Sequence, residues 1–137
     1  MPSARNRIIG IQMYMYNISG FLHWGYNFYN NQNSYDSINP FLFADSDYFG
    51  SAGDSFSVYP APDGTAFESL RNAVFHDAIQ DMRALKLCEQ FYGKEYVLEL
   101  MEKGVNPITF NEYPHGEEYI LNVREAVNKA VKSAMER

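Results

Sequence analysis

The stretch GFLHWGYNFYN, residues 20–30, decides how this chain is expected to fold. Residues 21–27 are almost continuously apolar or aromatic, and Gly20 separates them from the segment before. A short apolar run after a turn residue is typical of a strand that is covered on both faces, as in a parallel sheet. We therefore predict a buried strand over residues 21–27, with other elements packed on its two faces.

The segments on either side of this strand have opposite characters. Over residues 5–18 apolar side chains occupy almost every side of a helical wheel, which predicts a helix buried on more than one face. Residues 28–55 are rich in Asn, Ser, Asp and Gly, with aromatic residues between them. A loop of this length inside a domain is usually functional or disordered, and its many rings favour the functional interpretation.

The rest of the chain predicts one more strand and three helices. The second strand covers residues 56–59 and stops at Pro60, and the Thr65–Glu68 spacing indicates a capping box that opens a helix running to Tyr92. Gly93 and Gly104 bound a shorter helix over residues 94–103. A final amphipathic helix follows a proline-bracketed connector and begins near residue 117, with apolar positions at Ile120, Val123, Val127, Ala130, Val131 and Ala134.

This order of elements predicts an α/β chain, helix-rich and with about two short strands. It is the order expected at the end of a TIM-like β/α barrel, but two strands cannot close a barrel, so we expect the C-terminal portion of one. We place residues 1–104 in the barrel domain. Residues 105–137 then form a connector and a terminal helix that packs on the same domain.

Composition limits the classes of partner. An apolar fraction of 46% with 20% charged residues excludes a disordered chain, and a net charge of −6 argues against a nucleic-acid partner. The single cysteine, Cys88, cannot form an intrachain disulfide and lies in a helical apolar pattern, which favours a packing role and a reducing, cytoplasmic location. We see no signal peptide, no membrane span, and neither a metal nor a cofactor motif.

Aromatic residues suggest a polar ligand with flat faces. The chain has 11 Tyr, 10 Phe and one Trp, many of them among Asn, Ser and Gly in its first half. Sugars are bound by aromatic faces against their C–H faces and by polar side chains on their hydroxyls, and barrel ligands lie at the carboxyl ends of the strands. The candidate binding residues are His23, Trp24, Tyr26, Asn27, Asp54 and Tyr59.

Simpler interpretations stay open for several of these residues. Trp24 on a buried strand could belong to the core, and His23 could be a hydrogen-bonded interior histidine. Arg71, Asp77 and Asp81 have a spacing that predicts a charge cluster on one helix, for which a structural ion pair is a better explanation than catalysis.

Four motifs in order give a family resemblance over nearly the whole chain. They are the Arg-bearing segment MPSARNRIIGIQMYMYN, the strand GFLHWGYN, the segment GDSFSVYP and the helix ESLRNAVFHDAIQD. Together they resemble the C-terminal part of a domain of unknown function in bacterial proteins that is related to the glycoside hydrolase family 123 catalytic domain. The long helix departs from the commoner family form at Ala73, His76 and Ala78, where that form has Glu, Arg and Gly.

The resemblance implies a TIM-like barrel that cleaves β-linked N-acetylgalactosamine or related N-acetylhexosamines. In this substrate-assisted, retaining reaction the acetamido oxygen attacks the anomeric carbon, and the family's carboxylates are an adjacent Asp-Glu pair on an earlier strand. The chain contains no Asp-Glu dipeptide, so no catalytic residue carries over, and the isolated chain is expected to be inactive. Trp24 and Asn27 carry over as sugar-pocket wall, and Asp54 and Tyr59 as second-strand contributors.

Two functions therefore follow from the sequence. The first is a C-terminal fragment of a family 123-like glycosidase that contributes sugar-pocket wall. The alternative is a non-catalytic carbohydrate-binding or assembly module. In either case exposed apolar helix faces could support a homo-oligomer.

Overall fold

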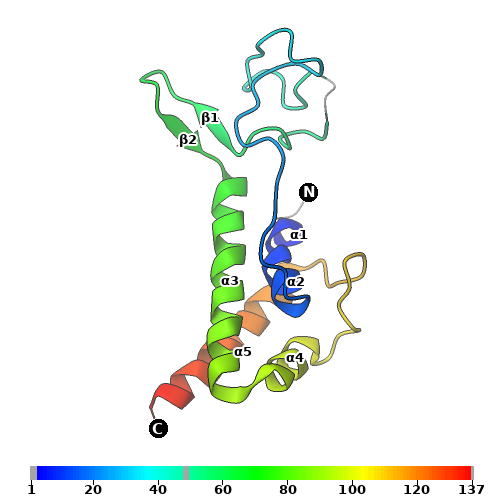
Figure 1. The fold of residues 1–137 in the computed structure, drawn as a ribbon, viewed down its shortest axis with the longest axis vertical. Helices are drawn as coiled ribbons and strands as arrows, with labels where there is room; N and C mark the ends of the chain where they lie inside the picture. Colours follow the sequence, from blue (N-terminus) through cyan, green and yellow to red (C-terminus); the bar gives the residue numbers. More distant parts are fainter. Residues whose placement is uncertain (1–2, 48–49, 137) are drawn as a thin grey trace. The chain divides into compact units, whose positions relative to one another are not determined.

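The computed structural model describes residues 3–47 and 50–136, which form two compact units. Unit 1 combines residues 1–20 with residues 74–137, and unit 2 consists of residues 21–73. Figure 1 labels the helices and the two strands along the chain. In the described residues the fold is mixed and helix-rich, as predicted, with one two-stranded antiparallel sheet. The division expected at residue 104 stays a prediction.

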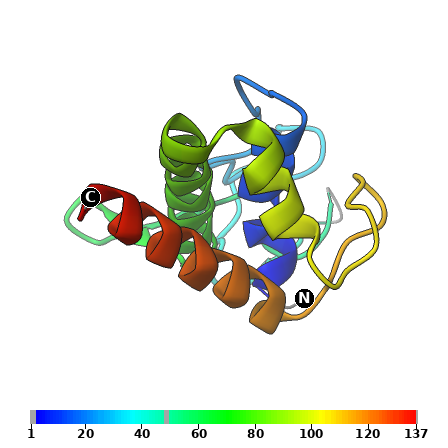
Figure 2. The same ribbon diagram turned by 90° about the horizontal axis from the view of Figure 1, so that it is seen from below.

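Unit 1 is a cluster of helices. Its N-terminal segment forms α1 (Ala4–Arg7) and α2 (Ile9–Met15), and α3 (Leu70–Tyr92) begins in unit 2 and continues here. The shorter α4 (Lys94–Glu102) and the terminal α5 (Glu117–Met135) complete the unit. Figure 2 shows α5 (orange to red) beside α4 and the α1–α2 pair. None of the helices in the described ranges is long and apolar enough to span a membrane.

The core of unit 1 confirms the predicted helical periodicity. Ile120, Val123 and Val127 of α5 are buried, and so is Cys88 of α3, which has the predicted packing role. The α1–α2 segment is covered on more than one side, because Ile11 and Gly10 are both buried and Gly10 lies directly against the backbone of Ala78. The predicted single helix over residues 5–18 is divided at Ile8 and ends earlier, at Met15.

The helix ends confirm the glycine signals but not the capping box. Gly93 has φ 84° and begins α4 immediately after α3, and Gly104 has φ 78° after α4. Thr65 does not open a helix, because Ala66–Glu68 forms strand β2. Helix α3 starts after Ser69 instead, whose Oγ accepts a hydrogen bond from the Asn72 N–H at 3.2 Å. Ser69 is therefore the residue that caps this helix.

Unit 2 contains a hairpin and long irregular segments. Strand β1 (Val58–Pro60) pairs antiparallel with β2 (Ala66–Glu68), with Tyr59 opposite Phe67. The turn at residues 62–64 is short enough to bring the chain straight back beside β1, which gives an antiparallel pair. The described strands form one two-stranded antiparallel sheet, and the expected barrel portion stays a prediction.

The predicted strand over residues 21–27 was also wrong. This segment forms only an isolated bridge, between Asn27 and Phe56, with the Phe28 N–H donating to the Ser55 carbonyl at 3.1 Å. Gly25 has φ +88°, outside the β region, and this turns the backbone so that no continuous ladder can form. The rings of Trp24 and Tyr26 are half-exposed.

Candidate functional site

All six predicted binding residues lie in unit 2. Four of them lie within residues 23–27 of the extended segment. Of the other two, Asp54 lies in the loop before β1 and Tyr59 lies in β1. We call this set the candidate face; its members are His23, Trp24, Tyr26, Asn27, Asp54 and Tyr59. The predicted roles of these residues in binding stay predictions.

Two of these residues meet through a side chain. The His23 Nε2 atom lies 3.0 Å from the Asp54 carbonyl oxygen and 3.7 Å from its carboxylate Oδ1. The Asp54 side chain is 64% exposed, so its carboxylate remains open to a ligand. This contact brings the extended segment to the loop that precedes β1, although the two residues are far apart in the sequence.

Backbone contacts extend this junction to Tyr26 and Asn27. The Ser57 N–H donates to the Tyr26 carbonyl at 2.7 Å, and Asn27 forms its bridge with Phe56. Just before them in the chain, Gly25 lies so close to Ser55 that a Cβ atom would stand 2.8 Å from the Ser55 Cα. A glycine is therefore required here by both the positive φ and the close approach.

The aromatic members of this segment are available to a ligand. Trp24 is 53% exposed and Tyr26 is 57% exposed, and the indole packs against Phe28 at a centroid distance of 4.8 Å. A half-exposed ring supported on one side presents the flat apolar surface that a sugar C–H face requires, together with a polar N–H or O–H at its edge. The core interpretation of Trp24 is therefore not supported by its exposure.

Tyr59 belongs to a neighbouring cluster around Phe56, which is fully buried. The Tyr59 ring lies edge-on to Phe56 at 5.3 Å and is tilted against Phe41 at 5.2 Å. Phe56 joins the two groups, because its backbone pairs with Asn27 while its ring contacts Tyr59. Tyr29 closes the cluster by donating from its hydroxyl to the Val58 carbonyl at 2.7 Å, and burial raises the pKa of its phenol.

The structure adds Arg71 to this cluster. Its Nη2 donates to the Phe56 carbonyl at 2.8 Å and to the Tyr59 hydroxyl at 3.1 Å. The sequence pattern placed Arg71 in a charge cluster with Asp77 and Asp81, which was wrong. Its position in the first turn of the helix, directly after β2, is the signal that could have identified it.

The two acidic members of the predicted cluster belong to unit 1. Asp81 is buried and accepts hydrogen bonds from Arg7 Nε at 2.6 Å, Arg7 Nη2 at 3.0 Å and Arg124 Nη1 at 3.0 Å. Hydrogen bonding to Asp81 is the main cause that raises the pKa of Arg7. Asp77 is half-exposed and lies 3.7 Å from Arg7 Nη1. This group ties α1, α3 and α5 together and is structural, in line with the non-catalytic interpretation.

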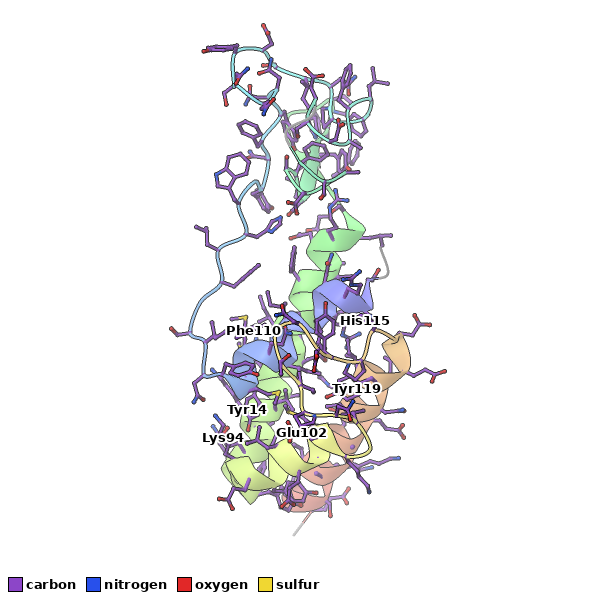
Figure 3. The ribbon with its side chains drawn as sticks, turned by 90° about the vertical axis from the view of Figure 1, so that its right-hand side faces the viewer. Tyr14, Lys94, Glu102, Phe110, His115 and Tyr119 are labelled. Atoms are coloured by element: carbon purple, nitrogen blue, oxygen red, sulfur yellow. The ribbon has the colours of Figure 1, made fainter. Side chains whose placement is uncertain are left out.

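A second polar feature of unit 1 is the connector between α4 and α5. Residues 104–107 and 111–115 line an open hollow of about 800 Å³. Figure 3 labels Phe110, His115, Tyr119 and Glu102 around this connector. Helix α2 holds it in place, since the Gln12 amide donates to the Thr109 carbonyl at 2.9 Å. Its lining includes the ionisable side chains of Glu112 and His115.

The described residues contain no group of three or more side chains suited to a metal ion. No Asp-Glu dipeptide occurs in the sequence. The site therefore offers aromatic surface and hydrogen-bonding groups, which can bind and orient a sugar.

One comparison with known proteins gives a match. The sequence model of a family described as "Glycoside hydrolase 123, catalytic domain" matches residues 1–88. The matched region contains the whole candidate face and Arg71, whereas the connector hollow and α5 lie beyond it. A search of curated proteins finds no match.

Proposed function

The chain belongs to the family of glycoside hydrolase 123 catalytic domains, and on this premise we propose that it supplies sugar-binding surface to a β-N-acetylgalactosaminidase-like site. The observation that carries the proposal is the pair of half-exposed rings, Trp24 and Tyr26, held against the Ser55 backbone through Gly25. Beside them the Asp54 carboxylate is open to sugar hydroxyls. An N-acetylhexosamine presents both the apolar ring face and the polar groups that such a surface accommodates.

The proposed role is binding and orientation, and not bond cleavage. In a substrate-assisted reaction one carboxylate orients the acetamide and a second protonates the leaving oxygen, in contrast to the usual two-carboxylate scheme. The chain has no Asp-Glu dipeptide to supply these groups, and its Glu117–Glu118 pair lies exposed at the start of α5, where it interacts favourably with the helix dipole. We place the chain in the C-terminal part of a TIM-like barrel whose earlier strands carry the acids.

Intrinsic fluorescence tests the binding surface directly, because Trp24 is the only tryptophan in the sequence. Titration of the 137-residue chain with N-acetylgalactosamine should change its emission saturably, whereas galactose, which lacks the acetamide, should bind more weakly. Calorimetry on Trp24→Ala should show an affinity for N-acetylgalactosamine that is lower by about tenfold or more. An aromatic ring at the centre of a binding surface contributes a large share of the binding free energy. Tyr35→Ala is the matched control, because Tyr35 is an 84% exposed ring of the same unit outside the candidate face. Equal affinities of Trp24→Ala and the wild type for N-acetylgalactosamine would contradict the assignment of Trp24 to the sugar-binding surface.

A non-catalytic carbohydrate-binding module is the alternative. It is favoured by the confinement of all six candidate residues to one compact unit. Incubation with an aryl β-N-acetylgalactosaminide separates the possibilities: sugar binding without turnover fits both binding roles, and turnover by the isolated chain would contradict the non-catalytic part of the proposal. An assembly role would use exposed apolar residues such as Leu87 and Met135, which line a hollow formed by α3 and α5, and sedimentation velocity would detect it.

A further inference from the structure

We propose that Arg71 is the positioning residue of the candidate face. It fixes Tyr59 and the backbone of residues 53–56, which in turn contacts the extended segment at Gly25 and Asn27. The inference rests on the proposed function for its link to sugar, and on the contacts of unit 2 for its geometry. Arg71 does not touch the ligand in this proposal. It acts through the residues that it holds.

The contacts of Arg71 point to this role. Its Nη2 donates to the Phe56 carbonyl and to the Tyr59 hydroxyl, and its guanidinium carbon lies 6.0 Å from the centroid of the Tyr59 ring. Across residues 3–47 and 50–136 no carboxylate lies within ion-pair distance of Arg71. Its charge is therefore directed at a backbone carbonyl and a phenol, and not at a salt bridge.

Each of these contacts lies on or next to a member of the candidate face. Tyr59 is itself a member, and Phe56 pairs through its backbone with Asn27. The guanidinium also packs on Gly53, whose neighbour Asp54 meets His23. The guanidinium thus contacts both strand β1, at Tyr59, and the loop that precedes it, at Gly53. The fork of the guanidinium suits this task better than a lysine ammonium, which is a compact point charge.

Gly53 shows how closely the guanidinium fits. Its φ is +80°, and a Cβ atom added there would collide with the Nη1 and Cζ atoms of Arg71. The turn before β1 is therefore shaped around Arg71. A Gly53→Ala change should displace the guanidinium without removing it.

The first experiment measures backbone hydrogen exchange in the full chain, with no sugar present. Arg71→Ala should raise exchange in residues 53–59 and leave α4 unchanged, because α4 belongs to the other unit. Arg83→Ala is the matched control, since Arg83 is an exposed arginine of the same helix and its loss changes the net charge equally. Unchanged exchange in residues 53–59 of Arg71→Ala would overturn the proposal.

The second experiment connects the geometry to sugar binding. Arg71→Ala should weaken N-acetylgalactosamine binding by about tenfold, and Arg83→Ala should leave it unchanged. Added methylguanidinium should restore at least part of the affinity of Arg71→Ala, which a general loss of stability would not allow. Failure of the wild-type chain to bind the sugar would overturn the proposed function, while the exchange result would still decide the positioning role.

Two further variants keep the test decisive if Arg71→Ala does not fold. Arg71→Lys retains a cation, and should give exchange and affinity between those of the wild type and a fully disrupted turn. Gly53→Ala in the wild-type background should raise exchange in residues 53–59, and should do so less in the Arg71→Lys background, because the bulk of the guanidinium is gone. If the effects of Gly53→Ala and Arg71→Lys on hydrogen exchange were additive, the close packing of Arg71 against Gly53 would be contradicted.

Discussion

Asp81→Asn is expected to destabilise unit 1 by about 3 kcal/mol. The Asp81 side chain is 5% exposed and accepts three hydrogen bonds from two guanidinium groups. Removing one partner of a buried ion pair costs roughly 3–5 kcal/mol, because the other charge is left without a partner. We take the lower end, since Arg7 is 23% exposed and Arg124 is 32% exposed, and both long side chains can turn toward water.

Urea unfolding followed by far-ultraviolet circular dichroism measures this change. With a slope of about 2 kcal/mol per molar urea, the midpoint should fall by roughly 1.5 M. Asp77→Asn is the matched control, because Asp77 lies one turn earlier on the same helix, is 52% exposed and stands 3.7 Å from Arg7. An exposed pair of this kind contributes less than about 1 kcal/mol, so the control should move the midpoint little.

Replacing the whole group tests the reasoning from the other direction. A triple variant, Arg7→Met with Asp81→Leu and Arg124→Met, leaves no uncompensated charge and should recover most of the stability lost in Asp81→Asn. The reasoning is refuted if Asp81→Asn costs less than about 1 kcal/mol, or if Asp77→Asn costs as much. It is also refuted if the triple variant is less stable than Asp81→Asn.

Two other predictions concern packing and pH. Gly10→Ala should cost about 1–3 kcal/mol in a thermal melt, because its Cβ would collide with the Ala78 carbonyl, whereas Gly20→Ala, with nothing within 4 Å, should be nearly neutral. Burial raises the pKa of Tyr119, so its contribution to stability is complete below about pH 10 and is lost as the pH rises further, when the unfolded chain ionises first. Urea unfolding measures the free energy of unfolding at about pH 9 and at about pH 11. The decrease between the two should be smaller for Tyr119→Phe than for the wild type, and an equal decrease would contradict the role of Tyr119 in this pH dependence.

The candidate face could be identified in part from the residues alone. Aromatic residues among Asn, Ser and Gly indicated a ligand surface in the first half of the chain, and the six candidates do lie in one unit. Their mutual arrangement could not be predicted, since His23 meets Asp54 and Asn27 meets Phe56 only after the chain turns at Gly25. Arg71 was assigned to the wrong partners because helical spacing describes neighbours on one helix and not contacts with a strand.

The amino-acid sequence by itself determined that most of the chain after residue 70 is helical, with breaks at Gly93 and Gly104 and a buried stripe on α5, as well as its membership of a glycoside hydrolase family. Helical signals are local, because each hydrogen bond and each apolar neighbour lies three or four residues away. Only the tertiary structure decided the antiparallel hairpin, the exposure of Trp24, the Arg7–Asp81–Arg124 group and the partners of Arg71. These features depend on residues distant in sequence, whose pairing is set by the packing of the whole unit and not by any local pattern.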